Sequence, residues 1–448
     1  MNAADQTSPA RTAEQAHCRR YGPGEHHIAL QSIPPEPLWV QRELRDAGFE
    51  AYLVGGCVRD LLLGYEPKDF DVSTSARPEA IRDIFRRSRI VGRRFQIVHV
   101  RSGREVIEVS TFRGHHGADF ESDAEDQPSG ASSAYAESGM LLRDNVFGTV
   151  EEDALRRDFT VNGLYYDPEA NCVLDFSSGV ADLEARLLRV IGDPVTRFQE
   201  DPVRMLRAAR FAAKLDFVIE DTALKAIAKC RKLLSQIPAA RMFDEVLKLL
   251  LSGQGEATFA ALDHLGLFEF IFPRTASALA ESPEERNLVV HALRNSDERI
   301  AQGKPVTPAF LYAAMLWPAL EKSVRELQEG AQLPALAAMH EAVPELVAEQ
   351  CRSTTIPRRF STPMREIWEL HQRLIARRSP QKLAAHPRFR AAYDFILLRE
   401  QSGESLDGAG EWWTRFQSGE PLPAPSSEAR PRRRRRRRGG SGRRQDGA

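Results

Sequence analysis

The spacing of hydrophobic positions along the chain changes near residue 180. Before that point, several short runs are apolar or alternate between apolar and polar residues, as β-strands do: Ala51–Val54, Phe95–Arg101, Glu105–Phe112 and Cys172–Phe176. Between them, stretches with a helical period occur at residues 37–47, 78–87 and 151–161. This first part of the chain is therefore predicted to be mixed α/β.

Beyond residue 180 almost every hydrophobic pattern is helical, at 202–215, 221–234, 239–252, 256–266, 283–300, 308–328, 333–350, 364–378 and 386–401. The sequence thus predicts an α/β head followed by an all-α neck and body, with disordered termini. We expect a disordered segment at 1–35, the head at 36–180, the neck at 181–275, the body at 276–415 and a disordered Arg-rich tail at 416–448. The polar stretch 115–138 is expected to be a loop inserted in the head.

Charge is unevenly distributed along the 448 residues, although the formal net charge is only −1. From Ser426 onward the chain carries ten arginines against two acidic residues, so the remainder is mildly acidic. The five cysteines form no C-x-x-C pair, which argues against a zinc ribbon or a disulfide framework. No apolar run approaches the roughly 18 residues of a membrane helix. We therefore expect a cytoplasmic protein without a membrane segment.

Residues 51–74 combine a glycine turn with a pair of acidic residues. An apolar run breaks at Gly55 and Gly56, and a second extended run carries Asp69 and Asp71. Because side chains alternate along a strand, the two carboxylates should project from the same face. Neighbouring carboxylates repel each other unless a cation lies between them, and Mg²⁺ favours oxygen ligands together with substrate phosphates. The pattern predicts a magnesium site formed by Asp69 and Asp71.

The glycines and Arg59 indicate a site for an anion. Glycine has no Cβ atom, so the backbone N–H groups of Gly55 and Gly56 can approach a phosphate closely. The guanidinium group of Arg59, in the next helical turn, suits a phosphate oxygen. A metal-binding acidic pair and an anion-binding turn in one short unit favour nucleotidyl transfer.

The stretches Gly55–Asp60 (GGCVRD) and Asp69–Asp71 (DFD) resemble the head of the class II nucleotidyltransferases, which include bacterial poly(A) polymerases and CCA-adding tRNA nucleotidyltransferases. Three further stretches match this family in the same order: Ile107–Gly114 (IEVSTFRG), Arg156–Asp167 (RRDFTVNGLYYD) and Glu200–Leu215 (EDPVRMLRAARFAAKL). The resemblance implies a polymerase-β-like mixed sheet in the head, two Mg²⁺ ions, ATP as a substrate and an RNA 3′ end as the acceptor.

The same resemblance implies roles for residues outside the first stretch. The third acidic metal ligand is either Glu108 or Asp158, and the sequence leaves both open. Arg157 and Asn162 are expected to contact the nucleotide, together with Asp158. For Asp201 and Arg204 the family implies hydrogen bonds to the Watson–Crick edge of the incoming adenine. The expected catalytic or metal-binding residues are Asp69, Asp71, Glu108 and Asp158, and the expected nucleotide-binding residues are Gly55, Gly56, Arg59, Arg157, Asn162, Asp201 and Arg204.

Basic residues in the neck and the tail suggest contact with RNA. Arg207, Arg210 and Lys214 continue the spacing of Arg204 and lie on one stripe of the same predicted helix. Such a stripe is usually a solvated helix face, but beside a nucleotide site it is a candidate RNA-binding surface. The Arg-rich tail is expected to bind RNA or another protein without base preference.

Within the family, finer likeness favours the bacterial poly(A) polymerase branch. It is carried by residues 91–100 (VGRRFQIVHV), residues 139–167 and the Arg-rich tail, and no HD-type phosphohydrolase signature follows. The sequence therefore predicts template-independent addition of AMP from ATP to RNA 3′ ends by two-metal nucleotidyl transfer, in RNA processing and decay. The alternatives are a CCA-adding tRNA nucleotidyltransferase and a non-catalytic RNA-binding scaffold. Nothing in the sequence indicates an oligomeric state.

Overall fold

The computed structural model describes residues 18–92, 96–114, 134–135, 141–143 and 146–422. The chain forms two compact units, residues 1–365 and 366–448, and each is described by itself. The expected neck and most of the expected body belong to the same unit as the head. The boundaries at residues 180 and 275 therefore stay predictions.

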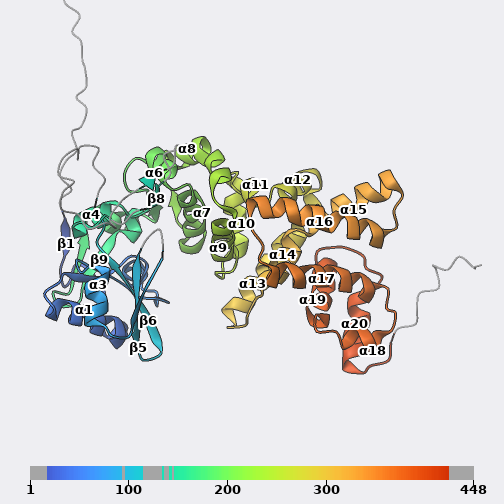
Figure 1. Ribbon diagram of the computed structural model, residues 1–448, viewed down its shortest axis with the longest axis horizontal. Helices are drawn as coiled ribbons and strands as arrows, with labels where there is room; N and C mark the ends of the chain where they lie inside the picture. The colour runs from blue at the N-terminus through green and yellow to red at the C-terminus, as the bar shows by residue number, and fades with distance from the viewer. Residues whose placement is uncertain (1–17, 93–95, 115–133, 136–140, 144–145, 423–448) are drawn as a thin grey trace, which may run out of the picture. The chain divides into compact units, whose positions relative to one another are not determined.

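The head contains a mixed eight-stranded sheet (Figure 1). Its strand order is β1-β10-β9-β2-β3-β6-β5-β4. Strands β3 and β6 pair in parallel, whereas the other neighbours in this sheet are antiparallel. The bounds are β1 (Arg19–Tyr21), β2 (Ala51–Val54), β3 (Asp71–Thr74), β4 (Ser88–Val91), β5 (Ile97–Ser102), β6 (Glu105–Thr111), β9 (Leu164–Asp167) and β10 (Cys172–Asp175). The predicted α/β head is confirmed.

Helices cover both faces of this sheet. Helices α1 and α3 pack on one face and α4 on the other, with bounds Pro35–Asp46, Pro78–Ile84 and Val150–Leu155. On the α4 face, Val54 and Tyr165 form an apolar cluster with Ala154. Asp71 is the partner of Val54 in the neighbouring strand, and residues paired in this way project to the same face. The α4 face therefore carries the predicted acidic site.

The N-terminal segment is more ordered than the sequence indicates. Residues 1–17 lie outside the described residues, but the prediction of disorder is wrong for residues 18–35. Strand β1 pairs with β10 at the edge of the sheet, and a 3-10 turn follows at Leu30–Ser32. The apolar side chains of Tyr21, Ile28 and Ile33 are buried. Their burial and the strand pairing offset the loss of chain entropy, which the polar composition alone does not reveal.

The prediction of a single helix at 151–161 is also wrong, since two short helical segments take its place. Helix α4 ends at Leu155, and a 3-10 helix, η2, spans Thr160–Asn162. Between them Phe159 is extended and fully buried, and it forms an isolated bridge with Val190. Pairing with this distant segment interrupts the helix, a tertiary effect that the local period does not contain.

The remainder of the first unit is mostly helical, as predicted. Its elements are α2 (Gly56–Leu62), α5 (Gly179–Glu184), α6 (Pro194–Glu200), α7 (Val203–Leu215), α8 (Asp221–Cys230), η3 (Arg231–Gln236), α9 (Ala239–Leu250), α10 (Gly255–His264), α11 (Phe268–Ile271), α12 (Pro273–Glu281), η4 (Pro283–Glu285), α13 (Arg286–Ala301), α14 (Pro308–Met315), α15 (Trp317–Ala331) and α16 (Ala335–Ser353). Contacts between the rings of Phe243, Phe272 and Tyr312 mark part of the core of these helices.

Two small strand pairs supplement the main sheet. Strands β11 (Leu187–Leu188) and β12 (Val218–Ile219) pair in parallel within the region expected to be helical. Strands β7 (Ala134–Tyr135) and β8 (Leu141–Arg143) pair antiparallel. The rest of the insertion expected at 115–138 lies outside the described residues.

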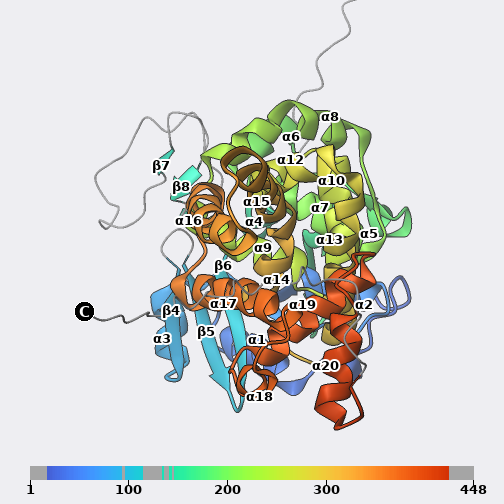
Figure 2. The same cartoon turned by 90° about the vertical axis from the view of Figure 1, so that its right-hand side faces the viewer.

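The second unit is a small helical cluster, seen in Figure 2 as α18, α19 and α20 beside α17. The bounds are α17 (Arg358–Ile375), α18 (Pro380–Ala384), α19 (Phe389–Gln401) and α20 (Ala409–Ser418). Trp412 and Trp413 lie in its core. Because α20 continues to Ser418, the tail expected from residue 416 begins later. Residues 423–448, with the arginine run, lie outside the described part of the chain.

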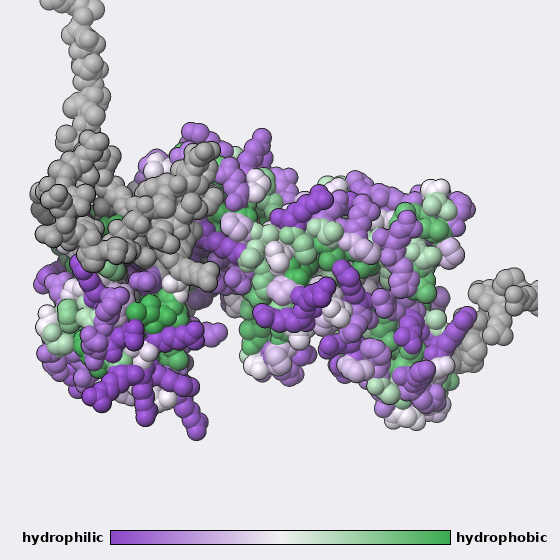
Figure 3. All heavy atoms as spheres, viewed as in Figure 1, coloured by the Kyte–Doolittle hydropathy of each residue, from purple (hydrophilic) through white to green (hydrophobic). Residues whose placement is uncertain are grey.

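Hydrophilic residues cover most of the face drawn in Figure 3. Large exposed apolar side chains in the described ranges are spread along the chain: Leu30, Trp39, Tyr65, Val106, Val218, Leu336 and Leu422. In the same ranges, no helix combines the length and apolar character that crossing a membrane requires.

His371 makes the stability of the second unit depend on pH. Its side chain is fully buried, and Arg399 Nη1 lies 3.0 Å from its Nε2. Since arginine is always a donor, that nitrogen accepts and the ring is neutral. Burial, followed by the charge of Arg399, lowers the pKa of His371 to about 3. The unfolded chain binds this proton below about pH 6.5, whereas the folded chain binds it only near pH 3. The free energy of unfolding should therefore fall as the pH drops through this window.

We expect this group to remove about 2 kcal/mol from the free energy of unfolding between pH 7.5 and 5.0. Urea denaturation at both pH values, monitored by tryptophan fluorescence, measures this change in the free energy of unfolding. The variant His371→Gln keeps an acceptor for Arg399 but does not titrate, so its pH dependence should be weaker. An equal pH dependence in the variant and the original chain would contradict this assignment.

Candidate active site

Three carboxylates approach one another where β3 and β6 run side by side. Asp71 is the first residue of β3 and pairs in register with Glu108 of β6. Asp69 lies before the strand rather than in it, so the predicted pair on a single strand is wrong in this detail. On the other side of Glu108, His99 of β5 places Nε2 3.4 Å from Oε1 of the carboxylate. Asp71 and Glu108 thus lie side by side on neighbouring strands, and Asp69 lies just before the first of these strands. These three residues are called the carboxylate row below.

The charges of this row act on Asp71. Burial, together with the charges of Glu108 and Asp69, raises the pKa of Asp71 to about 6, against the lowering effect of Arg157. A divalent cation would relieve this repulsion, and carboxylate oxygens are ligands that suit Mg²⁺. Within the described ranges, no group of three or more His, Cys, Asp or Glu residues is arranged to hold a metal ion. A divalent cation bound at Asp71 and Glu108 would therefore need water or substrate oxygens to complete its set of ligands.

At the glycine turn, the group available to an anion is not the backbone N–H of Gly55, as the sequence predicts. The N–H of Gly55 donates to the carbonyl of Leu164 at 3.0 Å, so it is already engaged. Gly55 has a φ of +77°, and a Cβ atom there would lie 3.3 Å from Nη1 of Arg157. Glycine is needed for this backbone conformation and for the close approach of Arg157. The nearby cation is therefore Arg157, while Gly56 begins α2.

Arg59 points into the protein rather than toward an open anion site. Its side chain is buried, with Nε 2.7 Å from Oδ1 of Asp60 and Nη1 2.6 Å from Oδ1 of Asn162. Asn162 in turn donates from Nδ2 to Oδ1 of Asp158 at 3.3 Å. The residues expected to contact the nucleotide thus form a hydrogen-bonded chain with one another.

Asp158 is separated from the carboxylate row by its partners. Its Oδ2 accepts from Nε of Arg207 at 2.6 Å and lies 2.5 Å from Nη2 of the same residue. Burial alone would raise the pKa of Asp158, but the charge and hydrogen bonds of Arg207 outweigh it and the pKa lies below its usual range. The carboxylates that raise the pKa of Asp71 are Glu108 and Asp69. Of the two alternatives for a third carboxylate, the structure brings Glu108 to Asp71.

The basic stripe of α7 contacts the rest of the first unit. Arg207 pairs with Asp158, and Nζ of Lys214 lies 3.7 Å from Oδ2 of Asp60. Arg210 stacks on the ring of Phe211, with its guanidinium carbon 4.5 Å from the ring centre. The stripe therefore joins the neck to the head, and its predicted contact with RNA stays a prediction.

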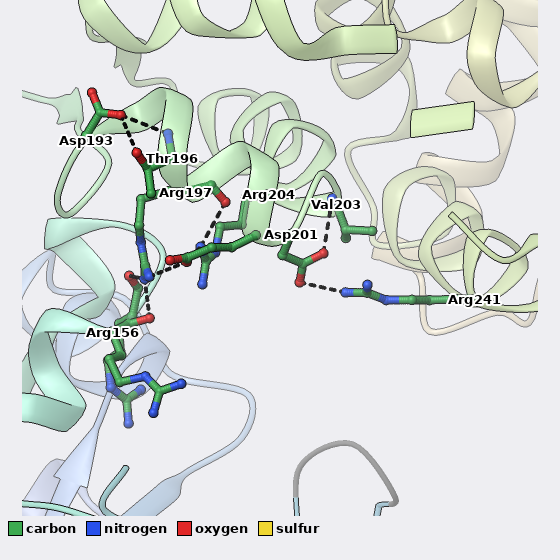
Figure 4. Close-up of polar contacts among 10 residues, drawn as sticks. Arg156, Asp193, Thr196, Arg197, Asp201, Val203, Arg204 and Arg241 are labelled. Carbon is green, nitrogen blue, oxygen red and sulfur yellow. Dashed lines mark hydrogen bonds and ion pairs between the residues drawn. The ribbon is translucent and has the colours of Figure 1, made fainter. Parts of the chain in front are cut away.

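Asp201 and Arg204, the predicted base-reading pair, each contact another residue of the protein, as Figure 4 shows. Oδ2 of Asp201 lies 2.7 Å from Nη2 of Arg241, on α9. Nη1 of Arg204 lies 3.0 Å from Oε2 of Glu200. Sequence reasoning missed Arg241 because its contact joins α9 to the turn between α6 and α7, which is far from it in the chain. A base read by Asp201 would have to replace Arg241, whereas Arg204 has further N–H donors besides the Nη1 that contacts Glu200.

Asp153, on α4, is a further residue that sequence reasoning missed. Its Oδ2 accepts from Tyr165 Oη at 2.5 Å, from Arg157 Nη2 at 3.1 Å and from Ser73 Oγ at 3.2 Å. Burial alone would raise the pKa of Asp153, but Arg157 and the hydrogen bonds outweigh it, and the pKa lies below its usual range. Asp153 therefore holds Arg157 at the glycine turn.

A sequence signal for the start of this helix does exist. Thr149 and Glu152 form a capping box, in which each side chain accepts from the backbone N–H of the other residue. This T-x-x-E pattern places Asp153 in the first turns of α4. It does not reveal the partners of its carboxylate, which lie on three other segments.

Three family models match the chain. The model described as "Poly A polymerase head domain" matches residues 51–189. The model "Probable RNA and SrmB- binding site of polymerase A" matches residues 216–279, and "Polymerase A arginine-rich C-terminus" matches residues 331–444. The first of these models covers the carboxylate row, the glycine turn and Asp153.

Curated proteins and solved structures give the same grouping. Poly(A) polymerase I of Haemophilus influenzae is 45% identical over 420 residues, which cover 91% of this chain and 91% of that protein. A CCA-adding enzyme of Streptococcus suis is 39% identical over 228 residues, 50% of this chain and 52% of that protein. The crystal structure of the Bacillus stearothermophilus CCA-adding enzyme in complex with CTP is 26% identical, with a TM-score of 0.53, and covers 86% of this chain and 83% of that chain.

Replacing Asp153 tests its role in holding Arg157. The variant Asp153→Asn removes the negative charge beside a mostly buried guanidinium, and we expect it to lower the free energy of unfolding by about 3–5 kcal/mol. Asp263→Asn is the matched control because Asp263 pairs with Arg286 while both side chains are well exposed, 40% and 38%. It should cost less than about 1 kcal/mol. Chemical denaturation measures both, and equal losses would show that Asp153 is not special.

Proposed function

The chain belongs to the poly(A) polymerase family, and on that premise we propose that it adds AMP residues from ATP to RNA 3′ ends without a template. It is a nucleotidyltransferase, as its near full-length relatives named poly(A) polymerase I indicate. The observation that carries the site assignment is the register of β3 and β6, which sets Asp71 beside Glu108 with Asp69 just before the strand.

Asp69 and Asp71, with Glu108, would hold the divalent ions, which we propose to be two Mg²⁺. When bound, such ions lower the pKa of the RNA 3′-hydroxyl and offset the charge of the leaving pyrophosphate. The support for this assignment is the repulsion at Asp71 and the all-oxygen donor set. Asp158 is proposed to orient Asn162 and Arg207 instead of binding metal.

The other residues of the site would bind and orient the nucleotide. Arg157, held by Asp153 against Gly55, is suited to donate to the triphosphate. Asp201 can accept from the adenine amino group and Arg204 can donate to a ring nitrogen. For this, Asp201 has to leave Arg241, whereas Arg204 can keep Nη1 on Glu200 and donate from another of its N–H groups. The selection of ATP then rests on hydrogen bonds rather than on a template strand.

RNA is the proposed acceptor, and the match to a model of an RNA-binding region at residues 216–279 supports it. The Arg-rich tail is proposed to add sequence-independent affinity for RNA. All five cysteines are free, which fits a reducing compartment, and we propose the cytoplasm as the site of action, in RNA processing and decay.

The choice among nucleotides tests the proposed reaction. The protein is incubated with Mg²⁺, an RNA primer and each ribonucleoside triphosphate separately, and the products are resolved on a sequencing gel. We expect long tails from ATP and none from GTP or UTP, because only adenine and cytosine place an amino donor beside an accepting ring nitrogen, as the base-reading pair requires. Addition of a single A to tRNA after CTP-dependent steps would support a CCA-adding enzyme instead. Absence of incorporation would support an RNA-binding scaffold.

The carboxylate row is tested by isosteric substitution. Asp71→Asn, Asp69→Asn and Glu108→Gln should each lower the extension rate by about 10²–10⁴-fold, since each removes charge from the metal site. Glu105→Gln is the matched control, because Glu105 lies on the same strand and its side chain alternates to the opposite face. Asp158→Asn should mainly lower stability, through the loss of its pair with Arg207. A rate unaffected by Glu108→Gln but abolished by Asp158→Asn would reverse the assignment.

A further inference from the structure

Arg197 is a buried arginine on α6 to which the sequence gives no role. Its side chain is 10% exposed, and Nη2 donates to the main-chain carbonyls of Arg156 and Arg157, the latter at 2.8 Å (Figure 4). Nη1 donates to Oε2 of Glu200 at 2.7 Å. Nε is buried and has no hydrogen-bond partner within the described ranges.

The contacts of Nη2 reach the triphosphate end of the proposed site. The carbonyl of Arg157 belongs to the residue whose guanidinium group approaches Gly55. A guanidinium group is planar and donates in fixed directions, so contact with two successive carbonyls restricts the backbone there. The orientation of Arg157 therefore depends on Arg197 as well as on Asp153.

The contacts of Nη1 and of the main chain reach the base-reading end. Oε2 of Glu200 accepts both from Arg197 and from Nη1 of Arg204, the latter at 3.0 Å. The carbonyl of Arg197 also accepts from Nη1 of Arg204, at 2.9 Å. One residue thus holds the backbone of Arg157 and the side chain of Arg204.

Stability does not account for this placement. Burial, together with the charges of Arg204 and Arg156, lowers the pKa of Arg197 to about 10. A buried cation beside other cations costs free energy, and an apolar side chain of similar volume often replaces such a group without loss. The specific value of an arginine here is its reach to both ends of the site.

We propose that Arg197 is a positioning residue that couples the triphosphate end of the nucleotide site to its base-reading end, an inference that rests on the proposed function. At the triphosphate end, it fixes the backbone through the carbonyls of Arg156 and Arg157. At the base-reading end, it fixes the side chain of Arg204 through Glu200 and its own carbonyl. Substitution should therefore alter both ends at once.

Equilibrium binding of inorganic tripolyphosphate, ATP and UTP to the full chain separates the two ends. Tripolyphosphate reports on the first end alone, and the ratio of ATP to UTP affinity reports on the second, because uracil has a carbonyl and a ring N–H where adenine has an amino group and an accepting ring nitrogen. By calorimetry, we expect Arg197→Met to weaken tripolyphosphate binding roughly tenfold and to lower the ATP-to-UTP ratio roughly tenfold, through the loss of charge-assisted hydrogen bonds. Arg197→Lys keeps the charge but not the fork, so it should restore both only in part.

The control is Arg274→Met. Arg274 lies on α12, and this change removes its two side-chain hydrogen bonds, to Glu349 and to Ser323. It should change stability without changing either affinity. A folded Arg197→Met variant that retains both affinities, or loses only one of them, overturns the proposal.

Should Arg197→Met not fold, Glu200→Gln decides the question, because it weakens the bridge between Arg197 and Arg204. It should lower the ATP-to-UTP ratio and leave tripolyphosphate binding unchanged, and an unchanged ratio overturns the proposal. Failure of the original chain to bind ATP or to extend RNA would reject the proposed function itself, a result distinct from any of these.

Discussion

The parallel register of β3 and β6 is the constraint on which the site depends. On the α4 face it sets Asp71 beside Glu108, and on the opposite face the next pair, Val72 and Val109, is fully buried. The raised pKa of Asp71 corresponds to a penalty of about 3 kcal/mol for its charged form. Burying two valines contributes about 1.5–3 kcal/mol each, which exceeds that penalty. A slip by one residue would put the carboxylates into the core, so the register is strongly specified.

A second layer of organisation joins the head to the neck. The hydrogen-bonded chain from Arg59 through Asn162 to Asp158 ends at Arg207 on α7. The guanidinium groups of Arg59 and Arg207 also face the ring of Phe211, at 5.4 and 5.3 Å. Buried charges are tolerated when they are paired and hydrogen-bonded, and this chain meets that condition. Residues of the nucleotidyltransferase motifs therefore also hold two regions of the first unit together.

The base-reading residues are held by ion pairs that resemble the contacts they would make to a base. Asp201 accepts from the guanidinium group of Arg241, and Arg204 donates to the carboxylate of Glu200. On the proposed function, a base read by Asp201 must replace Arg241, so the net gain from that hydrogen bond is small. The proposed site would then draw most of its affinity from the phosphates and its discrimination from the base hydrogen bonds.

The sequence by itself determined the class of fold and the family, and it proposed the chemistry of the site. Alternating and helical periods are local properties, and the D-x-D, glycine-turn and RRD segments each lie within a few residues. Only the tertiary structure decided which carboxylate accompanies Asp71, that Asp158 serves Arg207, and that Asp153, Arg197 and Arg241 support the site. The physical reason is that strand register and helix docking bring together residues far apart in the chain, and no local period records those pairings. The same reason explains why β1 and the break after α4 were missed.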